Sequence, residues 1–149
     1  MTGSGTLIAG DFRSDRQRTV YQWFLSFAEH GALPSRADFD PANFPNVLSH
    51  LVLVDVEEAP RRYRVRLVGT AVVDATGRDG TGDYYDQNDG TAAATERAAA
   101  LVESRKPSFE TGLPMLWSPK DYKIYSVLSL PMSSDGRNVD MIMYCLDFE

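Results

Sequence analysis

Cysteine and histidine are scarce in this chain, with one cysteine and two histidines among 149 residues. Cys145 alone cannot build a disulfide framework or a thiolate metal cage. Its place in the apolar run MIMYCLDF predicts a buried side chain. His30 and His50 do not have the spacing of a metal-binding pair, and no Cys, Ser or Thr lies in a recognisable nucleophile motif. We therefore expect no metal site and no enzyme activity.

Long hydrophobic runs and an excess of basic residues are also missing. No apolar stretch approaches the roughly 20 residues that span a bilayer, and the N-terminus lacks the pattern of a signal peptide. The formal net charge is −6; residues 1–70 carry 8 Arg and 8 acidic residues, so the excess falls on residues 71–149, with 7 basic against 13 acidic. We expect a cytoplasmic protein that binds neither nucleic acid nor membranes.

The length fits one domain with one core. Residues 1–13 are small and Gly-rich in their first ten positions and are expected to form a flexible arm, and residues 14–149 to form a single domain. An amphipathic helix is predicted over residues 14–30, with Ser14 as its N-cap, because four large apolar residues recur at helical spacing. This stripe either packs within the monomer or forms a dimer seam, and it is the candidate interface: Val20, Trp23, Phe24 and Phe27.

The rest of the chain predicts an α+β fold. Two strands are followed by short helical pieces, one Ala-rich helix capped by Thr91, and three further strands. In the second strand Tyr63, Val65 and Leu67 alternate with Arg64 and Arg66 and should share one face. The predicted strands are 51–58, 60–69, 108–117, 122–131 and 138–148, and the predicted helical segments are 41–49, 70–77 and 92–105.

The segment GRDGTGDYYD, residues 77–86, is rich in glycine and aspartate, as many binding loops are, but it does not match the motifs of the common ones. A phosphate-binding loop needs Lys and Ser or Thr after its second glycine, and Asp83-Tyr84 stand there instead. The glycine spacing of a dinucleotide fold and the ligand spacing of an EF-hand are absent too. The segment is therefore expected to turn the chain closely over the sheet, and Asp79 or Asp83 is expected to reach Arg66 if the loop is anchored there.

Motifs on both sides of this loop resemble the alphaproteobacterial PAS-domain family often labelled PAS_5. In that family an Arg in the second strand precedes a Gly-Thr pair, a short helix and a G-R-x-x-T-G loop. The matching residues here are Arg66, Gly69-Thr70, Gly77-Arg78 and Thr81-Gly82, with Leu33-Pro34, Arg36, Asp38 and Pro41 upstream.

The resemblance implies a PAS-like five-stranded antiparallel sheet with short helices on one face and an N-terminal amphipathic helix. A ligand pocket is expected between the helices and the sheet. The reactive cysteine of light-oxygen-voltage flavoproteins is absent from residues 77–87, and the long helix has no histidine to bind haem. The cofactor is therefore unknown, and flavin without a thiol adduct or a small metabolite remains open.

Candidate ligand-binding residues are an arginine within a strand, which can meet a carboxylate or phosphate, and residues that can form the walls of a pocket. They are Arg66, Thr70, Trp117, Tyr122, Tyr125 and Tyr144. The predicted function is a non-enzymatic sensory or regulatory domain that binds a small molecule and signals through a homodimer or a separate effector protein. The alternatives are an enzyme with a cone-shaped fold of the ketosteroid-isomerase kind, and an interaction module whose pocket is filled.

Overall fold

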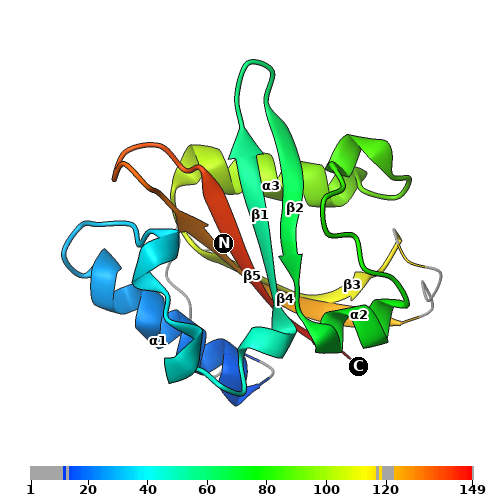
Figure 1. The fold of residues 1–149 in the computed structure, drawn as a ribbon, viewed down its shortest axis with the longest axis horizontal. Helices are drawn as coiled ribbons and strands as arrows, with labels where there is room; N and C mark the ends of the chain where they lie inside the picture. The colour runs from blue at the N-terminus through cyan, green and yellow to red at the C-terminus, as the bar shows by residue number, and fades with distance from the viewer. Residues whose placement is uncertain (1–11, 13, 117, 119–122, 149) are drawn as a thin grey trace.

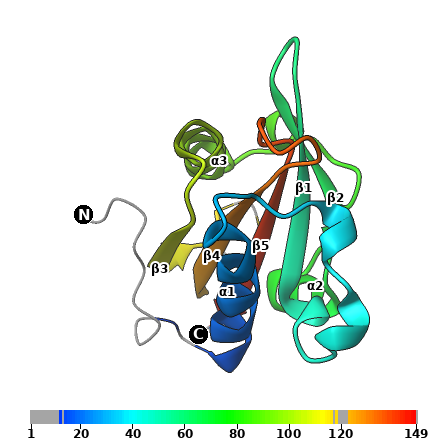
Figure 2. The ribbon, with the colours of Figure 1, turned by 90° about the vertical axis from the view of Figure 1, so that its left-hand side faces the viewer.

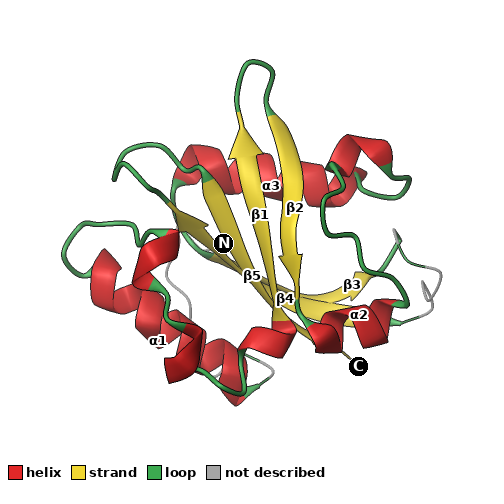
Figure 3. Ribbon diagram, viewed as in Figure 1, coloured by secondary structure: helices red, strands yellow, loops and turns green. Residues whose placement is uncertain are grey.

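A computed structural model of the chain describes residues 12, 14–116, 118 and 123–148. Its centre is a five-stranded antiparallel sheet with the strand order β2-β1-β5-β4-β3 (Figures 1 and 3). The α+β fold and the five antiparallel strands confirm the prediction. The strands are β1 (Leu51–Glu57), β2 (Arg62–Val68), β3 (Ser108–Pro114), β4 (Ile124–Met132) and β5 (Met141–Phe148).

Three α-helices and several short 3-10 turns accompany the sheet. The helices are α1 (Asp15–Ala28), α2 (Thr70–Thr76) and α3 (Ala92–Ser104). The 3-10 turns are η2 (Arg36–Asp38), η3 (Pro41–Asn43), η4 (Leu48–His50) and η5 (Tyr85–Gln87). In Figure 1, α3 runs behind β1 and β2, and in Figure 2, α1 lies in front of β4 and β5. The sheet is therefore covered by helices on both faces.

The two faces of the sheet carry two separate hydrophobic clusters, because side chains alternate along each strand. One cluster joins Leu53 of β1, Leu128 of β4 and Met143 of β5 to helix α1. The other joins Val54, Val127 and their neighbours to residues of α2 and α3. Cys145 is fully buried in the first cluster, as the apolar run around it predicts.

Helix α1 belongs to the chain's own core. The Ser14 hydroxyl accepts a hydrogen bond from the Gln17 backbone amide at 3.3 Å, which caps the helix as predicted. Val20 and Phe24 are 0% and 1% exposed. Gln17 is also buried, and its amide donates to Ser126 Oγ and to the Cys145 carbonyl, each at 3.2 Å. Of the two alternatives kept open for the apolar stripe, the structure has Val20 and Phe24 packed within the monomer.

The other two residues of the stripe pack against the segment that follows α1. Trp23 forms edge-to-face contacts with Phe27 and Phe39, with ring centroids 5.4 Å and 5.3 Å apart. Phe39 stacks on Phe44 at 5.1 Å. The aromatic rings therefore hold the segment with the turns η2 and η3 against the helix. Trp23 and Phe27 remain partly exposed, and their role in a dimer stays a prediction.

A β-bulge changes the face of the sheet toward which the last side chains of β2 point. Leu53 pairs with Leu67 and Val54 with Val65, so Arg66 is the extra residue. Val65 faces the α2 and α3 side, whereas Leu67 packs with the α1 cluster. The prediction that Val65 and Leu67 share a face was therefore wrong. A simple two-residue period cannot anticipate an inserted residue.

Candidate ligand pocket

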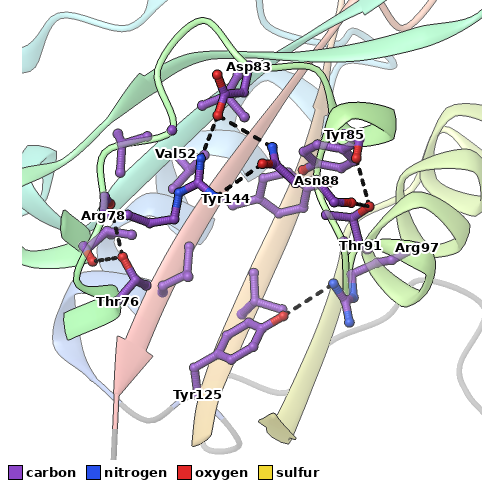
Figure 4. A pocket seen from close by; sticks show the side chains of 17 residues that line it. Val52, Thr76, Arg78, Asp83, Tyr85, Asn88, Thr91, Arg97, Tyr125 and Tyr144 are labelled. Atoms are coloured by element: carbon purple, nitrogen blue, oxygen red, sulfur yellow. Dashed lines mark hydrogen bonds and ion pairs between the residues drawn. The ribbon is translucent and has the colours of Figure 1, made fainter. Parts of the chain in front are cut away.

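A cavity of about 130 Å³ lies between the sheet and the helices α2 and α3. Its lining comes from β1, β2, β4 and β5 of the sheet, from both helices, and from the chain between them (Figure 4). The lining is largely aliphatic, and the aliphatic residues are Val52, Val65, Val68, Val72, Ala94, Val127 and Leu146. A mostly apolar cavity with a few polar groups is the usual form of a small-molecule site.

The loop after α2 forms one wall of this cavity and is held by backbone hydrogen bonds to β2. Gly77 ends α2 with a φ of +82°, a left-handed conformation that glycine adopts without steric cost. The amide of Val65 donates to the Asp83 carbonyl, and the amide of Gly82 donates to the Val65 carbonyl, each at 2.8 Å. The loop therefore closes over the sheet, as predicted from its glycines.

Side chains fasten the end of the loop to the same strand. Arg62 forms a bidentate pair with Asp86 at 2.7 and 2.8 Å, and its guanidinium lies 3.6 Å from the centre of the Tyr84 ring. The Tyr84 hydroxyl donates to Glu57 Oε1 at 2.8 Å. These contacts are largely exposed, so each contributes little alone, but together with the backbone bonds they define where the wall lies.

A polar group on the loop lines one side of the cavity. Arg78 donates to Asp83 Oδ2 at 2.6 Å and to Asn88 Oδ1 at 3.2 Å (Figure 4). Asn88 Nδ2 lies 3.4 Å from the same Asp83 oxygen. The positive charge of Arg78 is thus balanced by Asp83 within the wall itself, and neither residue meets Arg66.

A second polar group lies on the other side of the cavity, where α3 approaches β4. Arg97 of α3 donates through Nε to Glu110 Oε1 at 2.8 Å. Figure 4 shows its other contact, in which Nη1 lies 3.5 Å from the Tyr125 hydroxyl. The Tyr144 hydroxyl is buried and meets no partner of hydrogen-bonding geometry among the described residues. The Tyr85 phenol interacts with it electrostatically without forming a well-aligned hydrogen bond.

Burial keeps the phenols of this group protonated. Desolvation raises the pKa of Tyr85 to about 12 and that of Tyr144 well above its ordinary value. Burial also raises the pKa of Tyr125, although the nearby Arg97 guanidinium acts in the opposite direction. Near neutral pH this side of the cavity therefore presents hydroxyl groups that can donate hydrogen bonds, beside one guanidinium.

These shifts predict a loss of stability at alkaline pH. A phenol with a raised pKa in the folded state stabilises the fold fully below its unfolded pKa of about 10, and that contribution is lost as pH rises through the folded value. We expect the free energy of unfolding, measured by urea titration, to fall between pH 10 and 12 by up to about 1.4 kcal/mol per pH unit for each such group. The variant Tyr144→Phe should lose less stability over this range, and a profile parallel to that of the wild type would contradict the assignment.

The structure brings together two of the six ligand-binding candidates. Tyr125 and Tyr144 line the cavity, from β4 and β5. Arg66 lies outside its lining; the bulge turns its side chain outward, 63% exposed, where Nε pairs with Asp55 Oδ2 at 2.8 Å. Thr70 is exposed at the start of α2 and does not line the cavity either. Whether any of these residues binds a ligand stays a prediction.

The remaining two candidates, Trp117 and Tyr122, lie outside the described residues.

The anchor expected between Arg66 and the loop is absent from the contacts of the described residues. Asp83 pairs with Arg78, and Asp79 accepts from the Thr81 amide and hydroxyl at 3.0 and 2.6 Å. The expectation failed because the bulge turns Arg66 toward Asp55.

Two arginines of the lining were not predicted. Arg97 follows Ala94 by three residues and precedes Leu101 by four, so it lies on the same helical stripe as the apolar face of α3. A cation at an apolar position of a helix was the signal that could have identified it. Arg78 was visible within the G-R-x-x-T-G motif, but nothing in the sequence showed which way its side chain points.

Thr91 occupies the N-cap position of α3 but does not cap it by its side chain. Its hydroxyl instead donates to the Tyr85 and Asn88 carbonyls, at 2.8 and 3.0 Å. The predicted capping bond was wrong, since the hydroxyl is directed at two carbonyls of the preceding turn and accepts no amide of the helix. Thr91 therefore ties the turn η5, which contributes Tyr85, to the start of α3.

The described residues contain no group of three or more His, Cys, Asp and Glu side chains placed to hold a metal ion. No helix among the described residues combines the length and the hydropathy needed to cross a bilayer.

The chain is similar to known proteins in its sequence and in its fold. The PAS_5 family model, described as a PAS domain, matches residues 12–104. A crystal structure of a sensory box sensor histidine kinase from Vibrio cholerae is similar, with a TM-score of 0.49 and 17% identity over 72% of this chain and 87% of that chain. No curated protein matches the chain.

Proposed function

Because this chain belongs to the PAS domain family, we propose that it is a sensory or regulatory domain that responds to a small molecule bound between the sheet and helices α2 and α3. The observation that carries this proposal is the cavity of about 130 Å³ with the buried Tyr144 hydroxyl at its wall, which meets no partner of hydrogen-bonding geometry among the described residues. A buried polar atom without a partner costs free energy, so an occupant that supplies one is favoured.

The domain works by binding rather than by catalysis. None of the described lining residues is His, Cys, Ser or Lys. The one carboxylate of the described lining, Asp83, is paired with Arg78. The described lining thus offers no paired nucleophile and base.

The signal leaves through protein contacts. Occupancy changes the packing of α2, α3 and the loop against the sheet, and this change reaches a second copy of the chain or a separate effector protein. Trp23 and Phe27, which remain partly exposed on α1, are the candidate contact residues of a homodimer.

Benzene is a suitable first probe, because an apolar cavity of about 150 Å³ is known to hold it. We expect benzene to shift the amide resonances of residues lining the cavity in a two-dimensional NMR spectrum of the full chain. Ala94→Phe, which fills the cavity from α3, should abolish these shifts. Ala93→Phe, at an exposed position of the same helix, is the matched control and should retain them.

Native mass spectrometry of the same samples reports oligomer mass and bound small molecule together. An oligomer distribution that changes when the cavity is filled supports the homodimer route, and an unchanged one contradicts it. Benzene shifts spread over the surface, or equal in Ala94→Phe and the wild type, would overturn the proposal that this cavity is a ligand site.

A further inference from the structure

The two polar groups of the cavity differ in how fully their hydrogen-bonding capacity is used. On the loop side, the charges of Arg78 and Asp83 balance each other, and Asn88 bridges them. An occupant is not needed to satisfy this group. The Arg78, Asp83 and Asn88 group therefore forms part of the cavity wall without favouring a ligand of either charge.

In the group between α3 and the sheet, Arg97 and Tyr144 have hydrogen-bond donors that contacts among the described residues do not fully use. Among the described residues, the Arg97 guanidinium meets a carboxylate through Nε alone, at Glu110, and its Nη1 lies 3.5 Å from the Tyr125 oxygen, the outer limit of a hydrogen bond. The Arg97 side chain is 11% exposed, so solvent satisfies little of it. The Tyr144 hydroxyl, on a residue that is 5% exposed, has no partner of hydrogen-bonding geometry within the described part of the chain.

These side chains line the same cavity. Tyr125 and Tyr144 project from the neighbouring strands β4 and β5 onto one face of the sheet, and Arg97 comes from α3 across the cavity. Tyr144 interacts electrostatically with both Arg97 and Tyr125. Arg97 and the two phenols thus line one cavity, and the guanidinium of Arg97 and the hydroxyl of Tyr144 are the donors that contacts among the described residues use incompletely.

A guanidinium can only donate hydrogen bonds, and a protonated phenol can donate as well as accept, so the ligand group that can bond to both at once is an acceptor. A carboxylate has two oxygens that can accept several hydrogen bonds, and its burial requires an opposite charge, which Arg97 provides. An ammonium group would meet donors and a like charge. The aliphatic lining meanwhile requires an apolar body.

We propose that the ligand is a compact organic monocarboxylate, about the size of benzoate, whose carboxylate accepts from Tyr144 Oη and the Arg97 guanidinium while its apolar body lies against the valines. This inference rests on the proposed function. The cavity volume of about 130 Å³ sets the size. Glu110 lies outside the cavity lining and pairs with Arg97 only through Nε.

Four probes of one shape test the class of ligand: toluene, benzamide, benzoate and benzylamine, each titrated into the full chain by NMR. We expect benzoate to bind roughly tenfold more tightly than toluene or benzamide, because hydrogen bonds to a charged group are stronger than neutral ones. Benzylamine should bind more weakly than toluene.

Variants separate a binding role from a structural one. Tyr144→Phe should weaken benzoate roughly tenfold and leave toluene unchanged. Arg97→Gln should do the same. Glu110→Gln is the matched control, because it breaks the same ion pair but keeps the guanidinium, and it should bind benzoate at least as tightly as the wild type.

The outcomes distinguish this inference from the function on which it rests. Equal affinities for benzoate and toluene, or a benzoate affinity that Tyr144→Phe and Arg97→Gln leave unchanged, overturn the carboxylate class but not the cavity. Loss of benzoate binding in Glu110→Gln overturns it too, since the ion pair would then be what matters. Failure of all four probes to bind in the cavity overturns both proposals.

Discussion

Replacing Phe24 by alanine is expected to destabilise the chain by about 3–5 kcal/mol, the cost of removing a large aromatic side chain from a packed core. Phe24 is 1% exposed and belongs to the cluster that joins α1 to the sheet. A domain of this size has a total stability of about 5–15 kcal/mol, so the variant should be close to unfolding in mild denaturant. Urea titration followed by circular dichroism measures the effect.

The control for Phe24→Ala is Gln22→Ala, at an exposed position of the same helix, which should change stability by less than about 0.5 kcal/mol. The effect of Phe24→Ala should be the same at low and high protein concentration, because Phe24 packs within the chain itself. A midpoint that rises with concentration, together with a small effect of Phe24→Ala at low concentration, would mean that α1 gains its stability from a second copy.

Replacing Gly69 by alanine is expected to cost about 3 kcal/mol, at the upper end of what overpacking usually costs. An added Cβ would lie 2.2 Å from the Ser49 carbonyl oxygen and 2.6 Å from that of Leu48. These are backbone atoms of the turn η4, and they cannot rotate away as a side chain can. Gly69 is also fixed by the hydrogen bond of its amide to the Leu51 carbonyl at 2.8 Å.

Gly80→Ala is the matched control for Gly69→Ala, since the nearest atom to its added Cβ is the Asp83 Oδ2 at 3.8 Å. We expect this variant to remain within about 0.5 kcal/mol of the wild type in urea titration. If both glycine variants had the same stability, the close approach of η4 to the end of β2 would not constrain the fold.

Local signals account for the part of the fold that the sequence predicts. Ser14 and the spacing of Val20 and Phe24 define α1, and Gly77 ends α2 where a left-handed residue is needed. Tyr125 and Tyr144 were candidates for pocket walls, although aromatic residues of strands more often belong to the core, and both line the cavity. These features depend on residues close together in the sequence.

The remaining features depend on contacts between distant residues. The position of Arg66 follows from the pairing of β1 with β2, and an inserted residue leaves no local trace. Gln17 is buried because Ser126 and Cys145, more than a hundred positions away, satisfy its amide. The side-chain direction of Arg78 depends on Asp83 and Asn88. Sequence alone cannot show such partners.

The backbone of the loop also affects the edge of the sheet. Strand β2 is an outer strand, and an outer strand can recruit a further strand from another chain through its unpaired backbone groups. At Val65 both of these groups are already bonded, to Gly82 and Asp83. A peptide that extended the sheet here would have to displace the segment that carries Arg78 into the cavity. Strand addition at this edge and closure of the cavity are therefore mutually exclusive.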